Sequence, residues 1–277
     1  MSSPTMLQIL IDWKKWRYIS GSSENTIYAQ GKYAEKFIRS IRTNRADKVT
    51  PEMVHAFVND RDDKSFNTKS FALSSIRAFF AYAKGKGYCS INPTDIVKVN
   101  KRILSHKQRE GRVILPFTEE EVNVVLDVAP YFLRQATALS WFTGLRLGDI
   151  CGLEWDSITD DHIIVWTDKR DKRVALPLDH IAIGGGQVRK YIDEIEKVNS
   201  ILCFPTQNAL NSCTNTRSRT SDSFTKLVRS KGINDKSFHC LRHSFVTRLS
   251  NMGMDLTDIG KYVGHSNTQT TEGYNHV

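Results

Sequence analysis

Residues 131–150, YFLRQATALSWFTGLRLGDI, combine a long apolar segment with an abrupt stop. The apolar run predicts a buried helix from about Tyr131 to Phe142, and the glycine that follows Thr143 predicts its end. Arg146 then emerges between two glycines, directly after the predicted helix. This stretch therefore indicates a helical core with a charged side chain at its margin.

A hairpin and further helices are expected around this helix. Residues 163–166 (IIVW) and 174–178 (VALPL) are short apolar runs on either side of a charged stretch, as in two strands joined by a polar turn. Upstream, Thr118 and Glu121 form a capping-box pattern, which predicts that a domain opens with a helix there. Residues 206–223 are rich in Ser, Thr and Asn and predict a loop. We expect a mainly α domain with a small β-sheet, an α+β fold.

The first hundred residues predict four helices. The third begins at Thr50 and Pro51, and the fourth runs from about Asn67 to a stop at Gly85 and Gly87. Each helix carries apolar residues at helical spacing, which are expected to face a common core. These stripes are Leu7, Leu10, Trp13 and Trp16; Ile27, Tyr33, Phe37 and Ile41; Met53, Phe57 and Val58; and Leu73, Ile76, Phe80 and Ala83.

Residues 98–116 lack a sustained apolar period and carry many basic side chains. We interpret residues 101–116 as a basic linker between a helical domain at 1–100 and a second domain at 117–277. The linker could be a strap that closes two domains around a duplex, or a tether that only spaces them. Its candidate DNA contacts are Lys98, Lys101, Arg102, Lys107, Arg109 and Arg112.

Charge is distributed unevenly along the 277 residues. Residues 1–110 hold 20 Lys and Arg against 10 Asp and Glu, whereas the remainder holds 19 against 20. Such a polycation commonly binds a phosphate backbone, although a surface tuned for solubility would show the same excess. The five cysteines are scattered, and the sequence has neither an apolar run of membrane-spanning length nor a signal-peptide pattern. We therefore expect a reducing, cytoplasmic location.

Polar side chains of the second domain form an ordered set that suits one reaction. Two arginines can clamp the negative charge of a phosphorane-like transition state. A tyrosine can attack the phosphorus once a histidine takes its proton, and a lysine can protonate the leaving oxygen. The chemistry needs neither metal nor ATP, so we expect no cofactor. The set is Arg146, Lys169, His239, Arg242, His265 and Tyr274.

In the order of its residues and in the short sequence motifs around them, this set resembles the signature of the tyrosine recombinases. That family includes phage integrases, Xer recombinases and Cre. That signature is Arg, Lys, His-x-x-Arg, His or Trp, and Tyr. The resemblance covers about residues 117–277 and implies a catalytic domain of the DNA breaking–rejoining type. For the N-terminal region the resemblance is limited to general character: a helical domain like the core-binding domain of the family. The implied function is site-specific recombination of double-stranded DNA through a covalent 3′-phosphotyrosyl intermediate.

The resemblance also implies a role for each matching side chain. Asp149 would orient the pocket from behind Arg146. Apart from the resemblance, we expect His243 to support the helix and not to act on the substrate. The implied roles of the reacting groups are phosphate clamps for Arg146 and Arg242, general acid for Lys169, proton acceptor for His239, transition-state donor for His265, and nucleophile for Tyr274.

Several alternatives remain open from the sequence. Lys172 is an alternative to Lys169, because both fall in the same polar turn. His239 and His243 have the spacing of a zinc-binding helix, but the glutamate of that motif is absent and a neighbouring arginine would repel a cation, so we expect no metal. A type IB topoisomerase would share the chemistry, and a catalytically silent DNA-binding protein would share the scaffold.

The resemblance implies partners as well as chemistry. Homodimers would bind inverted half-sites, and two dimers could form a tetramer in synapsis. The sequence ends three residues after Tyr274, whereas many relatives continue into a further helix that packs on a neighbouring protomer, and this leaves tetramer assembly open. By analogy with the family, we expect integration or excision of a phage or mobile element.

Overall fold

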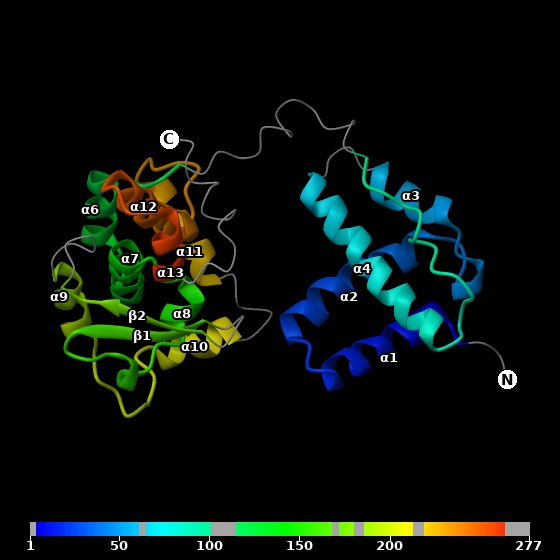
Figure 1. Cartoon of the computed structure of the whole chain (residues 1–277), viewed down its shortest axis with the longest axis horizontal. Coiled ribbons are helices and arrows are strands. Elements are labelled where there is room, and N and C mark those ends of the chain that lie inside the picture. Colours follow the sequence, from blue (N-terminus) through cyan, green and yellow to red (C-terminus); the bar gives the residue numbers. More distant parts are fainter. Residues whose placement is uncertain are drawn as a thin grey trace. The chain divides into compact units, whose positions relative to one another are not determined.

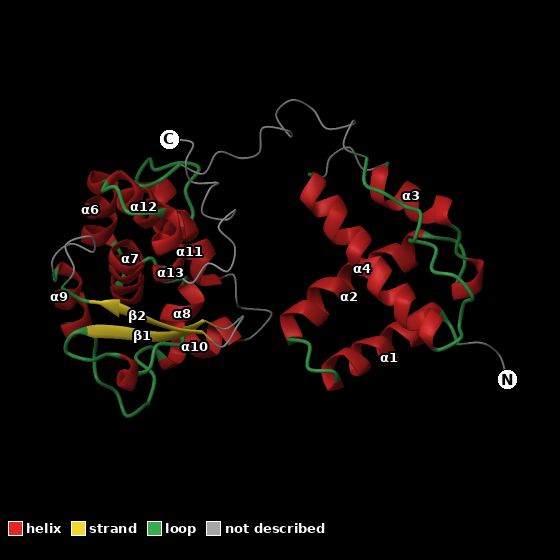
Figure 2. Cartoon of the chain, viewed as in Figure 1, coloured by secondary structure: helices red, strands yellow, loops and turns green. Residues whose placement is uncertain are grey.

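The computed structural model describes residues 4–60, 65–100, 115–167, 172–179, 186–212 and 219–263. The chain divides into two compact units, Met1–Val113 and Ile114–Val277. Figures 1 and 2 show that the first unit is helical and that the second combines helices with one hairpin. Within the described residues, no helix has the length and apolar character needed to cross a bilayer.

The first unit is a helical domain built on an aromatic core. Phe79 lies against Trp13 with ring centroids 5.9 Å apart, and Phe80 lies 6.1 Å from Phe37. All four rings are almost completely buried. These contacts join three helices: α1 (Met6–Ile19), α2 (Glu24–Ser40) and α4 (Phe66–Gly85). Between α2 and α4 the chain forms a short 3-10 turn, η1 (Ala46–Lys48), and helix α3 (Pro51–Asn59).

The buried stripe of α1 differs from the predicted one. Leu10 and Trp13 are buried as expected, but Leu7 is 39% exposed and Trp16 is 46% exposed. The buried residues Met6, Ile9, Leu10 and Trp13 follow the spacing i, i+3, i+4, i+7, which describes one face of a helix. The prediction chose a neighbouring face because apolar residues occur on both.

The second unit is a mainly α domain with a two-stranded antiparallel sheet, so the predicted α+β class is confirmed. Strands β1 (His162–Thr167) and β2 (Lys172–Pro177) pair with Val165 opposite Val174. Its other described elements are α6 (Glu119–Val128), α7 (Tyr131–Thr143), α8 (Leu147–Cys151), η2 (Trp155–Ser157), α9 (Gln187–Asp193), α10 (Pro205–Ser212), α11 (Arg219–Ser230), α12 (Phe238–Asn251) and α13 (Leu256–Tyr262).

Helix α7 is the centre of this domain. It is buried along most of its length and packs against α6, α8, α9 and α12, as Figure 1 shows. The helix stops at Gly144, in agreement with the prediction from residues 131–150. The next residues, which include Arg146, therefore leave the interior at a defined place.

The predicted loop at 206–223 is wrong for its described part. Residues 205–212 form α10, and α11 begins at Arg219. Helix α11 is stabilised by Phe224 and Val228, which are completely buried against the domain core. Tertiary burial overrides the weak helix propensity of Ser, Thr and Asn here.

Candidate active site

The segment that presents Arg146 is set by a glycine turn. Gly144 ends α7 with φ 70° and ψ 10°, a left-handed conformation that favours glycine, and its N–H donates to the carbonyl of Ser140 over 2.9 Å. Arg146 then caps the N-terminus of α8. The Asp149 carboxylate accepts the Arg146 backbone N–H over 3.3 Å and lies 3.7 Å from its Nη1. Asp149 therefore holds both the backbone and the side chain of Arg146.

The second arginine of the set, Arg242, is buried on α12 with 2% of its surface exposed. Its Nη1 donates to the carbonyl of Gly144 over 2.7 Å, and its Nη2 donates to the carbonyl of Val263. The guanidinium thus connects the end of α7, the middle of α12 and the residue that follows α13. These bonds fix the position of a charged group that would otherwise be costly to bury.

Arg146 and Arg242 line the same pocket, which has a volume of about 280 Å³. Both guanidinium groups remain charged at any physiological pH, so the pocket attracts an anion, and planar arginine forks match phosphate oxygens well. His239 also lines the pocket. The other lining residues are Ser140, Leu145, Leu147, Gly148, Asn211, Ser221 and Phe238.

The ring of His239, which lines this pocket, makes an edge-to-face contact with His243 of the same helix. The ring centroids of His239 and His243 are 4.9 Å apart with planes at 88°. Burial lowers the pKa of His239, and the charges of Arg242 and Arg146 lower it further. Burial, with smaller effects of His239 and Arg242, lowers the pKa of His243 to about 4. Both rings are therefore neutral at pH 7, and a neutral imidazole can accept a proton.

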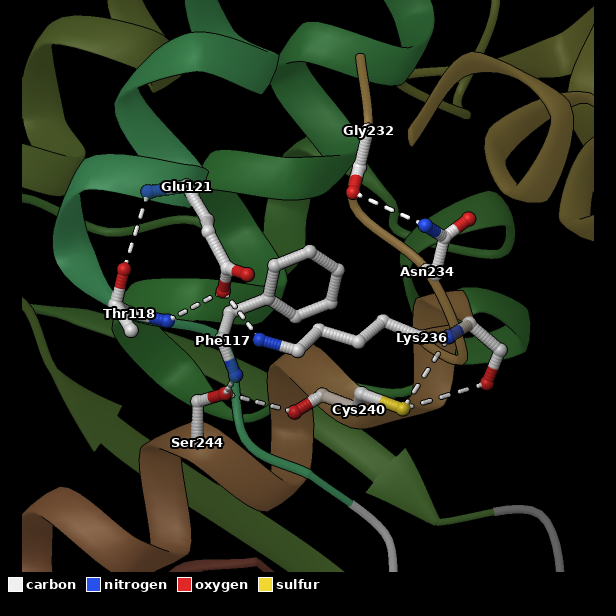
Figure 3. Close-up of polar contacts among 9 residues, drawn as sticks. Phe117, Thr118, Glu121, Gly232, Asn234, Lys236, Cys240 and Ser244 are labelled. Atoms are coloured by element: carbon white, nitrogen blue, oxygen red, sulfur yellow. Dashed lines mark hydrogen bonds and ion pairs between the residues drawn. The ribbon is translucent and has the colours of Figure 1, made fainter. Parts of the chain in front are cut away.

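The start of α12 is tied to the first residues of the domain by a polar cluster (Figure 3). Lys236 is only 8% exposed and pairs with the carboxylate of Glu121, while its Nζ lies 5.1 Å from the centre of the Phe117 ring. The backbone N–H of Phe117 donates to Ser244 Oγ over 2.6 Å, and that hydroxyl donates to the Cys240 carbonyl over 2.8 Å. The cluster thus fixes the chain three residues before His239, at Lys236, and fixes α12 two residues after Arg242, at Ser244.

Comparison with known proteins assigns the chain to a family. Residues 115–277 match the phage integrase family, and residues 16–87 match the N-terminal SAM-like domain of phage integrases. The chain belongs to the phage integrase family. It is an enzyme of the tyrosine recombinase type that binds and recombines DNA, which confirms the prediction made from the residue set.

Curated relatives of this phage integrase family member are Xer recombinases. The tyrosine recombinase XerC of Thermodesulfovibrio yellowstonii is 25% identical over 276 residues, with 93% of this chain and 87% of the relative covered. The tyrosine recombinase XerD of Staphylococcus haemolyticus is 28% identical, with 93% and 89% covered.

The fold is that of solved integrases. A lambda integrase dimer bound to a COC′ core site superimposes with a TM-score of 0.75 at 19% identity, with 98% of this chain and 95% of that chain covered. The Tn1549 transposon integrase in complex with a circular intermediate DNA gives a TM-score of 0.69 at 18% identity.

The structure brings together three of the six residues predicted to carry the chemistry of this integrase family member: Arg146, His239 and Arg242. Asp149 contacts Arg146, and His243 contacts His239. Lys169, His265 and Tyr274 lie outside the described residues. Lys172 begins β2, but its side chain also lies outside the description.

Of the candidate linker contacts, only Lys98 is described, and it is exposed. Its carbonyl accepts a hydrogen bond from the Asn59 side chain over 3.1 Å, which attaches this part of the chain to α3. The other five, Lys101, Arg102, Lys107, Arg109 and Arg112, lie outside the described residues. In the part of the chain that is described, no three side chains gather as a metal site would require.

Sequence reasoning missed three polar residues of the pocket: Ser140, Asn211 and Ser221. The last two fall in the segment that was predicted to be a loop. The i, i+4 spacing of Phe224 and Val228 is the one signal that could have revealed α11, and no comparable apolar pattern marks α10.

Proposed function

We propose that this recombinase cleaves and rejoins DNA through a covalent 3′-phosphotyrosyl intermediate, with Tyr274 as the nucleophile. The observation that carries the proposal is the shared pocket of Arg146, Arg242 and a neutral His239. Arg242 also bonds the carbonyl of Val263, and the chain that leads to Tyr274 continues from that residue. Arg242 is therefore bonded both to the turn that precedes Arg146 and to the residue from which the chain continues to Tyr274.

In the proposed reaction, the Tyr274 oxygen forms a bond to the DNA phosphorus while the bond from phosphorus to the 5′-oxygen breaks. His239 accepts the phenol proton, which its depressed pKa permits at neutral pH because the ring is unprotonated beforehand. Lys169, or Lys172 at the start of β2, supplies a proton to the departing oxygen. Reversal with another 5′-hydroxyl restores a phosphodiester, so the bond energy is retained and ATP is not needed.

Arg146 and Arg242 stabilise the charge that develops on the non-bridging oxygens, together with His265. Two charged donors fixed before the substrate arrives need no rearrangement in the transition state. Asp149 keeps Arg146 oriented, and the carbonyls of Gly144 and Val263 do the same for Arg242.

We extend the proposal to assembly and role. The excess of basic residues at 1–110 would bind the DNA backbone, with Lys98 and the linker residues among the contacts. The lambda integrase structures include a dimer on a core site and a tetramer on a Holliday junction, and we propose the same sequence of assemblies on inverted half-sites. The role would be integration or excision of a phage or mobile element in the cytoplasm.

A suicide substrate tests the chemistry. A duplex nicked near the cleavage position loses a short fragment after attack and should leave a covalent protein–DNA adduct. Tyr274→Phe should abolish the adduct and retain duplex binding, whereas Tyr262→Phe, a nearby control, should retain both. An adduct that persists in Tyr274→Phe would contradict the assignment of the nucleophile. Relaxation of supercoiled DNA without a specific site would instead indicate a type IB topoisomerase.

A further inference from the structure

Helix α10 contributes a neutral side chain to the wall of the phosphate pocket. Asn211 lines this pocket together with Arg146, His239 and Arg242. It also lines a neighbouring cavity of about 350 Å³ that includes Asp149, so its amide lies at the border between the two. Asn211 is neither a member of the ordered residue set nor one of its supporting residues.

Asn211 is held at this place by a close approach of α10 to α8. Its Nδ2 lies 3.7 Å from the point where a Cβ on Gly148 would be, and the Nδ2 of Asn208 lies 3.6 Å from the corresponding point on Gly152. The two glycines are one helical turn apart, so α8 offers α10 a surface without side chains. The Asn211 amide therefore lies against the turn of α8 that begins at Arg146.

The Asn211 amide is available to a ligand. It is half-buried, and among the described residues no hydrogen bond to its side chain occurs. An amide that is partly withdrawn from water, in a pocket that two arginines also line, gains most from an anionic acceptor, because a hydrogen bond to a charged partner is the stronger kind.

We propose that Asn211 is a further phosphate contact of this recombinase, which donates an N–H of its amide to a non-bridging oxygen of the DNA phosphate held by Arg146 and Arg242. This inference rests on the proposed function, since it assigns the same pocket to the same phosphate. A neutral donor adds a directed hydrogen bond without adding a third positive charge beside His239, whose pKa burial and the two arginines already lower.

The test compares Asn211→Ala with Asn208→Ala, a matched control on the same helix that approaches Gly152 and does not line the phosphate pocket. Single-turnover adduct formation on the suicide duplex should slow about 10- to 100-fold in Asn211→Ala, as expected for loss of a hydrogen bond to a charged group. Asn208→Ala should cleave at a rate within about twofold of the wild type, and both variants should unfold at the wild-type temperature. Asn211→Asp should be slower than Asn211→Ala, because a carboxylate repels the phosphate.

A wild-type rate in Asn211→Ala overturns the proposal, even if Asn211→Asp is slow, because a carboxylate would repel phosphate from any point on the wall. Equal losses in Asn211→Ala and Asn208→Ala also overturn it, since they would indicate damage to the contact between α8 and α10. If the wild type forms no adduct, the proposed function fails instead. In that case the affinity for duplex DNA tests the Asn211 contact independently of cleavage. Weaker binding by Asn211→Ala than by Asn208→Ala supports the contact, and equal binding overturns it.

Discussion

Replacement of Gly144 by alanine should damage the fold and the phosphate pocket together. At φ 70° an alanine adopts the left-handed conformation, which costs about 1–2 kcal/mol. The added Cβ would also lie 2.5 Å from Cδ1 and 3.0 Å from Cε1 of Phe245, a ring that is completely buried. Relief of such overpacking costs a further ~1–3 kcal/mol. We expect Gly144→Ala to lower the free energy of unfolding by about 2–5 kcal/mol.

The matched control is Gly253→Ala in the same domain. Gly253 follows α12 with φ 81°, but no atom lies within 4 Å of its would-be Cβ. This variant should therefore show only the backbone cost of about 1–2 kcal/mol. Urea denaturation of the full chain, followed by circular dichroism, measures both losses under the same conditions, and their difference isolates the clash with Phe245.

Cleavage provides the second measurement. The Gly144 carbonyl accepts from Arg242, so a shift of the α7 terminus should move the guanidinium and slow adduct formation in Gly144→Ala while Gly253→Ala remains active. Equal losses of unfolding free energy in the two variants would refute the steric argument. A Gly144→Ala enzyme that is less stable yet cleaves at the wild-type rate would refute the link between this turn and the position of Arg242.

Three further changes test the surroundings of the site. Arg242→Lys should slow adduct formation by at least about 10²-fold, since one ammonium cannot replace a fork fixed by two carbonyls, and suicide-substrate assays measure this. His243 binds its proton more weakly in the folded chain, where burial and His239 lower its pKa from 6.5 to about 4. The unfolded chain therefore takes up more protons below pH 6.5, and His243 should account for a fall in stability of about 2 kcal/mol between pH 7.5 and pH 5. When urea denaturation is repeated at each pH, the fall should be smaller by about this amount in His243→Asn, and a part should remain because the pKa of His239 is lowered as well. Lys236→Met should cost about 1–3 kcal/mol of unfolding free energy because Glu121 loses its partner, and a second change of Glu121→Gln should restore part of it in a thermodynamic cycle.

The fold was predictable where burial and local chain signals agree. The end of α7 at Gly144 and the start of α6 at Thr118 follow from a glycine stop and a capping box, both of which the structure shows. The hairpin followed from two apolar runs around a charged turn. Helix α10 could not be predicted in this way, because none of its residues is buried and its place depends on two glycines of α8 that are more than fifty residues away.

The candidate site was predictable in its chemistry but not in its geometry. Arginine and histidine on one face of α12 follow from their spacing in the sequence. Nothing in the sequence indicates that Arg242 bonds the carbonyls of Gly144 and Val263, because every residue supplies a carbonyl and only the completed fold selects two of them. The contribution of Asn211 was missed for a related reason: a neutral amide has no distinctive pattern until its neighbours are known.

Arg242 couples the folding of the domain to the assembly of the pocket. A buried guanidinium is unfavourable unless its donors are satisfied, and here two acceptors lie 98 and 21 residues away along the chain. The Gly144 carbonyl is in place only after α7 has ended, and the Val263 carbonyl only after α13 has packed on α12 through Ile259. If Arg242 is a phosphate clamp and Tyr274 is the nucleophile, as we propose, the chain that carries Tyr274 continues from Val263, the residue whose carbonyl fixes Arg242. Arg242 would then hold a phosphate firmly only when Val263, at the start of that chain, is in place.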